Sequence, residues 1–409
     1  MPGALSTILI LLLAVAVGLY QIYLSPFLVM YGLWRDIEPV GNADCSTVPE
    51  LKACEKLVLH QATGVVYLAC STPEARHKWI PGIGPFEENA HNDYVATYDL
   101  STGKVTRLNF VNFDFERGFA SHGMDVVSSA TNSDEMFVYL VNHRSPLDGK
   151  DPNIVGADSV VEIFKTKVGS SSLVHVTTVE DPVISTPNDL IGYPDGKSFY
   201  FTNDHGSFKT GALRLLRNCF TSIASVGYCH VEHGCSLVVP KIHAANGIAK
   251  AQNNTIYVAS TAGAAVSVFE RQEDNSLVLT DVIPTEVPLD NLSVDANGAL
   301  WAAGFPKSSA MVKHMKDITI PLPTRAVKIN INTGPGAFYG EKYKVEKAFE
   351  DDGTIASGST TVAYDAIHNR LFIHGLTAPS LVVCKMYFKH LCDRYDDDRN
   401  YFQPLTCSH

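Results

Sequence analysis

The chain has 409 residues, of which 45% are hydrophobic and 18% charged, and its formal net charge is −11 at pH 7. This composition suits a well-packed globular body. The acidic balance and the lack of a long basic run argue against binding to nucleic-acid phosphates.

The N-terminus is almost continuously apolar, and its first charged side chain is Arg35. Residues 5–24 are long enough to cross a bilayer as a helix, which needs about 20 residues. A cleaved signal sequence is the alternative, with residues 14–16 as a weak cleavage site. We favour an uncleaved anchor over 1–34 and a stalk over 35–44. Either alternative places the body in the secretory lumen or outside the cell, anchored or secreted.

Six segments of the body share one pattern, a turn residue or polar lead-in followed by an apolar run rich in β-formers. They are residues 63–69, 135–141, 196–202, 254–259, 298–303 and 369–374. They recur roughly every 45–75 residues, a spacing typical of blade repeats. Alternating segments with turn residues, such as 95–108, lie between them. The pattern predicts an all-β fold, a six-bladed β-propeller over 45–385, followed by a Cys-containing surface tail over 386–409.

Nine cysteines suit an oxidising compartment. None forms a CxxC pair, which disfavours zinc. A bridge between Cys45 and Cys384, at the two ends of the body, would close the ring. The other pairings stay open for Cys54, Cys70, Cys219, Cys229, Cys235, Cys392 and Cys407. Asn253 begins a glycosylation sequon that the compartment permits.

Polar residues shortly before the repeated segments are the candidates for a site in the central tunnel, where loops of all blades meet. The set consists of Glu55, Asn188, Asn246, Asp290 and Asn291. It offers carboxylate and amide oxygens with two negative charges, which suits Ca²⁺. Each Asn-Asp or Asn-Gly pair alone would be an ordinary turn. Their recurrence in phase with the blades favours a metal site.

Two histidines flank the second segment, His122 before it and His143 just after it. An imidazole titrates near neutral pH and is suited to proton transfer. Each histidine alone would more often be a hydrogen-bonded core or surface residue. No Gly-x-Ser-x-Gly elbow, Walker loop, HExxH sequence or Rossmann glycine set gives another chemistry local support.

An ordered series of short stretches carries a more specific resemblance. The stretches are 121–124, 140–143, 159–164, 187–189, 202–205, 245–248, 290–295 and 358–360, with Cys384 after them. Over residues 45–385 the chain resembles the paraoxonase/arylesterase family of calcium-dependent lactonases and esterases, which are six-bladed propellers.

The resemblance implies a hydrolase of lactones or carboxylic (aryl) esters. The five oxygen-bearing residues match the catalytic-calcium ligands, and Cys45 and Cys384 match the ring-closing disulfide. His122 and His143 match a histidine dyad in which His122 deprotonates the attacking water and His143 orients it or relays the proton. Glu55 is the rival base. The calcium would polarise the ester carbonyl.

Two departures from the family pattern concern Lys56 and Phe305. Asp189 and the Met124 carbonyl match ligands of a second, structural calcium, but Lys56 stands where the family has an acidic ligand. We hypothesise that the Lys56 ammonium replaces this ion by pairing with Asp189, which leaves one calcium in place of a possible two. Phe305, where the family often has histidine, makes the pocket more apolar.

Three functions remain in view: a lactonase or esterase, a gluconolactonase-like or strictosidine-synthase-like propeller enzyme, and a non-catalytic propeller that uses calcium as a strut. The partners expected are a small lactone or ester and a membrane contacted through the N-terminal segment, without nucleic acid.

Overall fold

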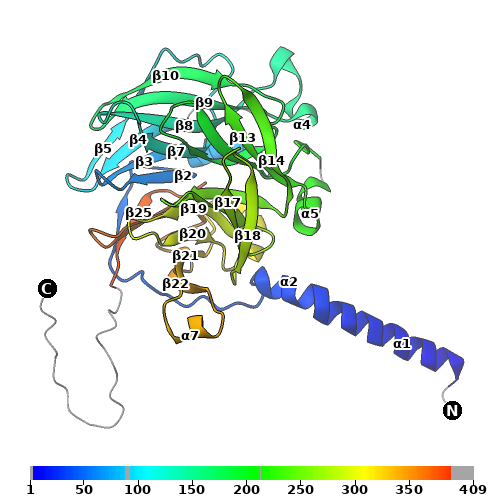
Figure 1. The fold of residues 1–409 in the computed structure, drawn as a ribbon. Helices are drawn as coiled ribbons and strands as arrows, with labels where there is room; N and C mark the ends of the chain where they lie inside the picture. The colour runs from blue at the N-terminus through cyan, green and yellow to red at the C-terminus, as the bar shows by residue number, and fades with distance from the viewer. Residues whose placement is uncertain (1–2, 88–92, 212, 388–409) are drawn as a thin grey trace, which may run out of the picture.

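The computed structural model describes residues 3–87, 93–211 and 213–387. The body consists of six β-sheets arranged around a common axis (Figure 1), so the predicted six-bladed propeller is confirmed. Apart from the short strand β6, neighbouring strands within a blade pair antiparallel, and successive blades follow one another along the chain.

The first three blades use strands β2 to β14. Blade one holds β2 (Lys56–His60), β3 (Val65–Cys70), β4 (Tyr94–Asp99) and β5 (Lys104–Arg107). Blade two holds β7 (Ser121–Ser128), β8 (Glu135–Arg144), β9 (Asp158–Lys167) and β10 (Ser172–Val179), with the short β6 (Asn109–Val111) parallel to β10. Blade three holds β11 (Pro187–Gly192), β12 (Ser198–Asn203), β13 (Ala224–His230) and β14 (Gly234–Ile242).

The last three blades complete the ring. Blade four holds β15 (Ala245–Lys250), β16 (Thr255–Ser260), β17 (Ala265–Arg271) and β18 (Leu277–Pro284). Blade five holds β19 (Leu289–Val294), β20 (Leu300–Gly304), β21 (Thr324–Ile331) and β22 (Tyr343–Asp351). Blade six holds β23 (Ser359–Asp365), β24 (Arg370–Gly375), β25 (Leu381–Lys385) and β1 (Cys45–Val48).

The six repeated segments of the sequence are the second strand of each blade, β3, β8, β12, β16, β20 and β24. Every residue of β3 and of β12 is buried. A strand that is covered on both faces reads as a continuous apolar run, which is why these segments stand out. Between blades five and six, for example, Trp301 stacks on Tyr364 with ring centroids 4.6 Å apart.

The ring closes where β1 pairs antiparallel with β25, so that the N-terminal strand completes the last blade. Cys45 lies opposite Cys384 in this pairing, and the two form the predicted disulfide. Further bridges join Cys54 to Cys70 and Cys229 to Cys235. Cys219, on α5 (Leu213–Phe220), forms no disulfide with any of the described residues. Cys392 and Cys407 lie outside the described residues.

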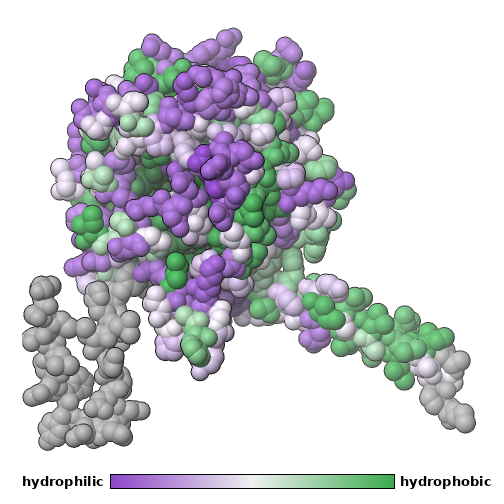
Figure 2. All heavy atoms as spheres, in the orientation of Figure 1, coloured by the Kyte–Doolittle hydropathy of each residue, from purple (hydrophilic) through white to green (hydrophobic). Residues whose placement is uncertain are grey.

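An apolar helical arm projects from the body (Figure 1). It consists of α1 (Ala4–Leu19), the π-helical turn η1 (Tyr20–Leu24) and α2 (Ser25–Met30). Hydrophobic side chains cover its surface (Figure 2), and residues Ser6–Met30 have the length and a mean hydropathy of 2.3 that allow a membrane span. Together with the disulfides, this arm is consistent with the secretory pathway.

We expect the ring-closing disulfide to contribute more stability than the hairpin disulfide. The sequence separations are 339 residues for Cys45–Cys384 and 6 for Cys229–Cys235. Chain-entropy arguments assign about 6 and about 2 kcal/mol to loops of these sizes. Denaturant unfolding of the two double-alanine variants should show the larger loss for Cys45→Ala/Cys384→Ala. Equal losses would contradict closure as the source of the stability.

Candidate active site

Most of the predicted site residues lie on the innermost strands of the blades, at places where the pairing with the second strand is irregular. Glu55 directly precedes β2, and His143 lies on β8, the second strand of blade two. The register shifts fall at residues 122–123, 188–189, 246–247, 290–291 and 360, one in each of blades two to six. A β-bulge re-aims the side chains that it contains. The bulges therefore turn one polar residue of each of these five blades into a single cavity, and these residues are His122, Asn188, Asn246, Asp290 and Thr360.

Glycines beside these residues let the innermost strands approach one another. A Cβ on Gly123 would lie 2.5 Å from the Asn188 carbonyl oxygen, and one on Gly247 would lie 2.6 Å from the Cα of Asn291. Any larger residue would push neighbouring blades apart. The Ser-His-Gly-Met and Ala-Asn-Gly-Ile stretches thus owe their glycines to this close approach.

The cavity at the axis has a volume of about 260 Å³ and a polar and an apolar part. Its polar lining includes Glu55, His122, Asn188, Asn246 and Asp290. Its apolar lining comes from loops and short helices outside the blades, and it includes Ile80, Ile83, Leu215, Phe305, Met311 and Leu322. Phe305 is on the wall where we expected it to make the pocket more apolar.

Four of the five predicted metal ligands carry a buried side-chain oxygen without a hydrogen-bond partner among the described residues. These atoms are Glu55 Oε2, Asn188 Oδ1, Asn246 Oδ1 and Asn291 Oδ1. An unpaired buried polar atom costs roughly 1–3 kcal/mol, and a hard cation is the partner that carboxylate and amide oxygens suit. The residues present therefore fit a calcium ion.

The side-chain amides of Asn188 and Asn291 are oriented so that their oxygens remain available to bind a cation. Asn291 Nδ2 donates to Glu55 Oε1 at 2.7 Å, and Asn188 Nδ2 donates to Asp204 Oδ2 at 3.4 Å. Since the nitrogen of each amide is thereby held by a carboxylate, its oxygen points elsewhere. Asp204 was not among our predicted site residues, although it lies in the 202–205 stretch of the resemblance.

The charges at the axis favour one divalent cation. Burial, with Glu55 and Asp189 nearby, raises the pKa of the buried Asp290 well above its usual range. When ionised, the carboxylates of Glu55, Asp189 and Asp290 sum to −3, and the Lys56 ammonium adds +1, so this group of four carries −2. One calcium ion would balance that charge and keep Asp290 ionised.

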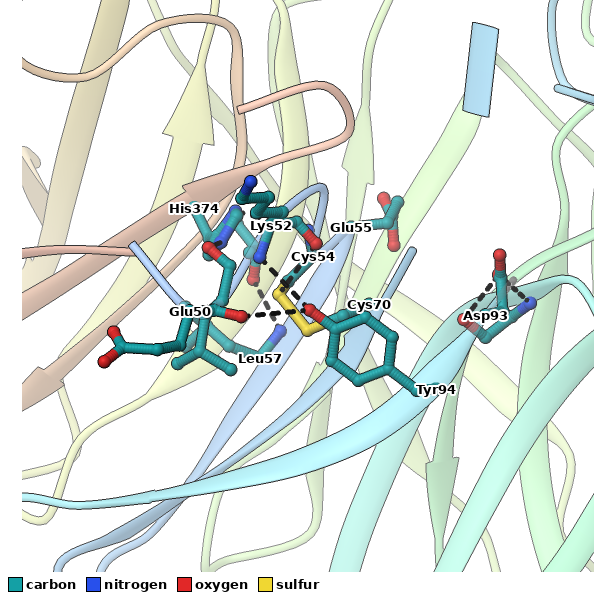
Figure 3. Close-up of a disulfide and its surroundings, with 12 residues drawn as sticks. Glu50, Lys52, Cys54, Glu55, Leu57, Cys70, Asp93, Tyr94 and His374 are labelled. Atoms are coloured by element: carbon teal, nitrogen blue, oxygen red, sulfur yellow. Dashed lines mark hydrogen bonds between the residues drawn. A yellow bond between two sulfur atoms is a disulfide. The ribbon is translucent and has the colours of Figure 1, made fainter. Parts of the chain in front are cut away.

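Glu55 is fixed by its chain neighbours. It follows Cys54, whose disulfide to Cys70 ties the start of β2 to the end of β3 (Figure 3). The Glu55 backbone nitrogen donates to the Ala69 carbonyl oxygen at 3.1 Å, and Thr360 Oγ1 donates to the Glu55 carbonyl oxygen at 2.8 Å. The bridge and these two bonds hold the carboxylate beside the cavity.

The two histidines form the hydrogen-bonded pair that the resemblance implies. His122 Nδ1 and His143 Nε2 are 2.9 Å apart, and His143 Nδ1 lies 2.8 Å from Ser159 Oγ. His122 Nε2 faces Glu55 Oε1 at 3.7 Å. Burial, and then the neighbouring His122, lowers the pKa of His143 well below its usual value, so His143 is neutral near pH 7. Ser159 is a site residue that we did not single out, although it begins the 159–164 stretch.

Lys56 forms the ion pair with Asp189 that we hypothesised. Its Nζ lies 2.6 Å from Asp189 Oδ2 and 3.3 Å from the Leu292 carbonyl oxygen. The two side chains are 5% and 0% exposed. Lys56 and the buried Met124 also line a second cavity of about 210 Å³, which does not include the calcium-ligand candidates or the histidines.

A comparison with known protein families shows to which family the chain belongs. A family model described as arylesterase matches residues 77–386. The chain belongs to the arylesterase family. Of the residues discussed, Glu55 and Lys56 precede the matched region, and His122, His143, Asn188, Asn246 and Asp290 lie within it.

The curated relatives of this chain are distant in sequence, but they match over most of its length. Serum paraoxonase/lactonase 3 of Homo sapiens is 23% identical over 360 residues, with 83% of this chain and 88% of the relative covered. Serum paraoxonase/arylesterase 2 of Homo sapiens is 26% identical over 337 residues, with 81% and 86% covered. A solved luciferin-regenerating enzyme is 16% identical with a TM-score of 0.47, covering 86% of this chain and 98% of that one. Family membership supports a hydrolase of esters or lactones.

We expect Lys56→Met to destabilise the protein strongly. Removing one partner of a buried ion pair leaves the Asp189 charge uncompensated, which typically costs about 3–5 kcal/mol. Lys197→Met is the matched control, because Lys197 pairs with Glu232 at the surface, where both side chains are about half exposed, and exposed pairs stabilise little. Thermal unfolding of both variants measures the difference. A Lys56→Met variant as stable as the control would show that the pair is unimportant.

Proposed function

We propose that this protein is a calcium-dependent hydrolase that opens lactones or carboxylic esters at the propeller axis. The observation that carries the proposal is a cavity lined by Glu55, Asn188 and Asn246, each with a buried oxygen that has no hydrogen-bond partner among the described residues, and by His122, which is paired with His143. A calcium ion held by Glu55, Asn188, Asn246, Asp290 and Asn291 would polarise the substrate carbonyl and stabilise negative charge on its oxygen.

His122 is the base that the hydrogen bonds favour. The Ser159 hydroxyl can accept from His143 Nδ1–H, which leaves His143 Nε2 as the acceptor for His122 Nδ1–H. His122 Nε2 then carries the free lone pair and can take a proton from a water molecule. The imidazolium that forms is stabilised by Glu55 Oε1 at 3.7 Å. His143 orients the ring in this scheme and keeps its tautomer fixed.

The apolar part of the cavity suits the rest of the substrate. Ile80, Phe305 and Leu322 would pack against an acyl or alkyl group and keep bulk water away from the carbonyl. A gluconolactonase-like activity would place several sugar hydroxyls against these side chains, which offer them no hydrogen bonds. The wall therefore favours apolar lactones and esters over sugar lactones.

We further propose that the protein stays anchored by its N-terminal arm, with the propeller in the lumen or outside the cell. The span Ser6–Met30 and the three disulfides support this topology. The sequon at Asn253 lies in the exposed turn between β15 and β16, where a glycan would be accommodated.

Hydrolysis of an aliphatic lactone should depend on calcium and on His122 separately. Chelation should abolish turnover, and Asn246→Ala should weaken calcium binding at least about tenfold because a ligand oxygen is lost. His122→Gln should lower kcat by about 10²–10⁴-fold with calcium affinity retained. The matched control is His60→Gln, since His60 bonds to Thr63 and Ser128 away from the cavity.

These measurements separate the alternatives. If chelation melts the protein while His122→Gln leaves turnover unchanged, the role of His122 as base is wrong. If a sugar-lactone panel is turned over faster than aliphatic lactones, the gluconolactonase-like alternative holds. Absence of any hydrolysis in calcium-loaded protein would leave a binding propeller.

Metal analysis should find one calcium ion per chain, because Lys56 already balances Asp189. Lys56→Asp would remove the ammonium and add a carboxylate, and it should allow a second ion to bind. Two tightly held ions in the unmodified protein, measured by elemental analysis after dialysis, would refute the replacement of an ion by Lys56.

A further inference from the structure

The segment that follows the apolar helices is fastened to the propeller beside the cavity. Arg35 Nη1 donates to the Pro306 carbonyl oxygen at 3.1 Å, and Arg35 Nη2 donates to the Glu286 carbonyl oxygen at 2.9 Å. The Ser309 backbone nitrogen donates to the Tyr31 carbonyl oxygen at 3.1 Å. These bonds reach the loop before β19 and the region after β20, so the arm is joined to the body by more than its covalent link.

Gly32 shows how closely the arm approaches the body. Its φ is +68°, and a Cβ at this position would lie 2.1 Å from the Pro306 carbonyl oxygen. Both the backbone conformation and the space therefore require glycine here. The turn at Gly32 directs the chain away from the arm immediately after Tyr31.

Aromatic contacts join the arm to α5. The Phe27 ring stacks on Tyr31 with centroids 4.4 Å apart and on Phe220 with centroids 5.6 Å apart. The Tyr31 hydroxyl lies 3.6 Å from the Cys219 sulfur. Tyr31 is thus held from both sides, by Phe27 of its own arm and by Cys219 of the propeller.

Tyr31 also lines the cavity that contains Glu55 and His122, together with Leu215 and Cys219. We propose that Tyr31 is a specificity-determining residue, and that the seating of the N-terminal arm on α5 shapes the apolar part of the substrate cavity. This inference rests on the proposed hydrolase function. A substrate whose carbonyl lies at the calcium ligands would direct its apolar substituent towards these side chains.

In this proposal the N-terminal arm forms part of the wall of the active-site cavity. Loss of the Phe27 and Phe220 contacts would release Tyr31 and widen the cavity, although every calcium ligand and both histidines would stay in place. The expected signature is a change in the preference among substrates, with KM affected more than kcat, since Tyr31 does not belong to the reacting group of residues.

The test uses the full-length chain in detergent with three variants. Tyr31→Ala removes the ring, Tyr31→Phe keeps it without the hydroxyl, and Tyr23→Ala removes a tyrosine of the arm that is 69% exposed. For each we would measure kcat and KM for an unsubstituted γ-lactone and for the same ring with a long alkyl chain. Tyr31→Ala should change the ratio of the two kcat/KM values by about tenfold, while Tyr31→Phe and Tyr23→Ala should leave it unchanged.

Alkylation of Cys219 provides a second readout that needs no turnover. Mass spectrometry of the Cys219 peptide after N-ethylmaleimide treatment should show faster modification in Tyr31→Ala than in the unmodified chain, with Tyr23→Ala unchanged. In the chain without substitutions, the long-chain lactone should slow the alkylation of Cys219, because the lactone would occupy the same cavity.

Two results would overturn the inference. One is an unchanged substrate ratio in a Tyr31→Ala variant that unfolds at the normal temperature. The other is a Cys219 alkylation rate that responds neither to Tyr31→Ala nor to the lactone. If no lactone or ester is hydrolysed at all, the proposed function fails, and protection of Cys219 by the lactone still decides whether Tyr31 borders a binding cavity.

Discussion

Three buried carboxylates at the axis of the ring, joined by one lysine ammonium, set the main constraint on this structure. Glu55, Asp189 and Asp290 come from three different blades, and like charges brought together in a protein interior repel strongly. Lys56 offsets this repulsion at Asp189, because its Nζ lies 2.6 Å from Asp189 Oδ2. The remaining charge and the unpartnered amide oxygens make a hard divalent cation the natural partner of the rest of the cluster.

The framework around the axis holds these groups together against their repulsion. The ring is closed by β1 and by the Cys45–Cys384 disulfide, so the innermost strands cannot move apart. The Cys54–Cys70 bridge fixes Glu55 locally. Bulges in the innermost strands of blades two to six aim polar residues inwards, and Gly123 and Gly247 allow the strands to come close. In this way the strands of rigid sheets, and not long loops, position most of the polar side chains that line the cavity.

In the proposed function, the surroundings of the axis divide into a reacting side and a binding side. The reacting side would comprise the oxygen-bearing residues and the His122–His143–Ser159 chain, in which each hydrogen bond would fix the tautomer of the next ring. The binding side is built from residues outside the blades, including Phe305 and, from the N-terminal arm, Tyr31. The same arm that could hold the protein to a membrane therefore contributes to the surface that a substrate would meet.

The sequence by itself determined the ring and the candidate residues at its centre. Second strands such as β3 and β12 are buried on both faces, so their apolar runs are visible without a structure, and the family resemblance identified Glu55, Asn246 and Asp290 as ligand candidates. Only the tertiary structure decided the parts that depend on contacts between distant segments: the partner of Cys54, the hydrogen bond from His143 to Ser159, the amide orientation set by Asp204, and the approach of Tyr31 to Cys219. Periodicity reports which face of a strand is buried, whereas these contacts join residues from separate elements, and no local pattern records which ones meet.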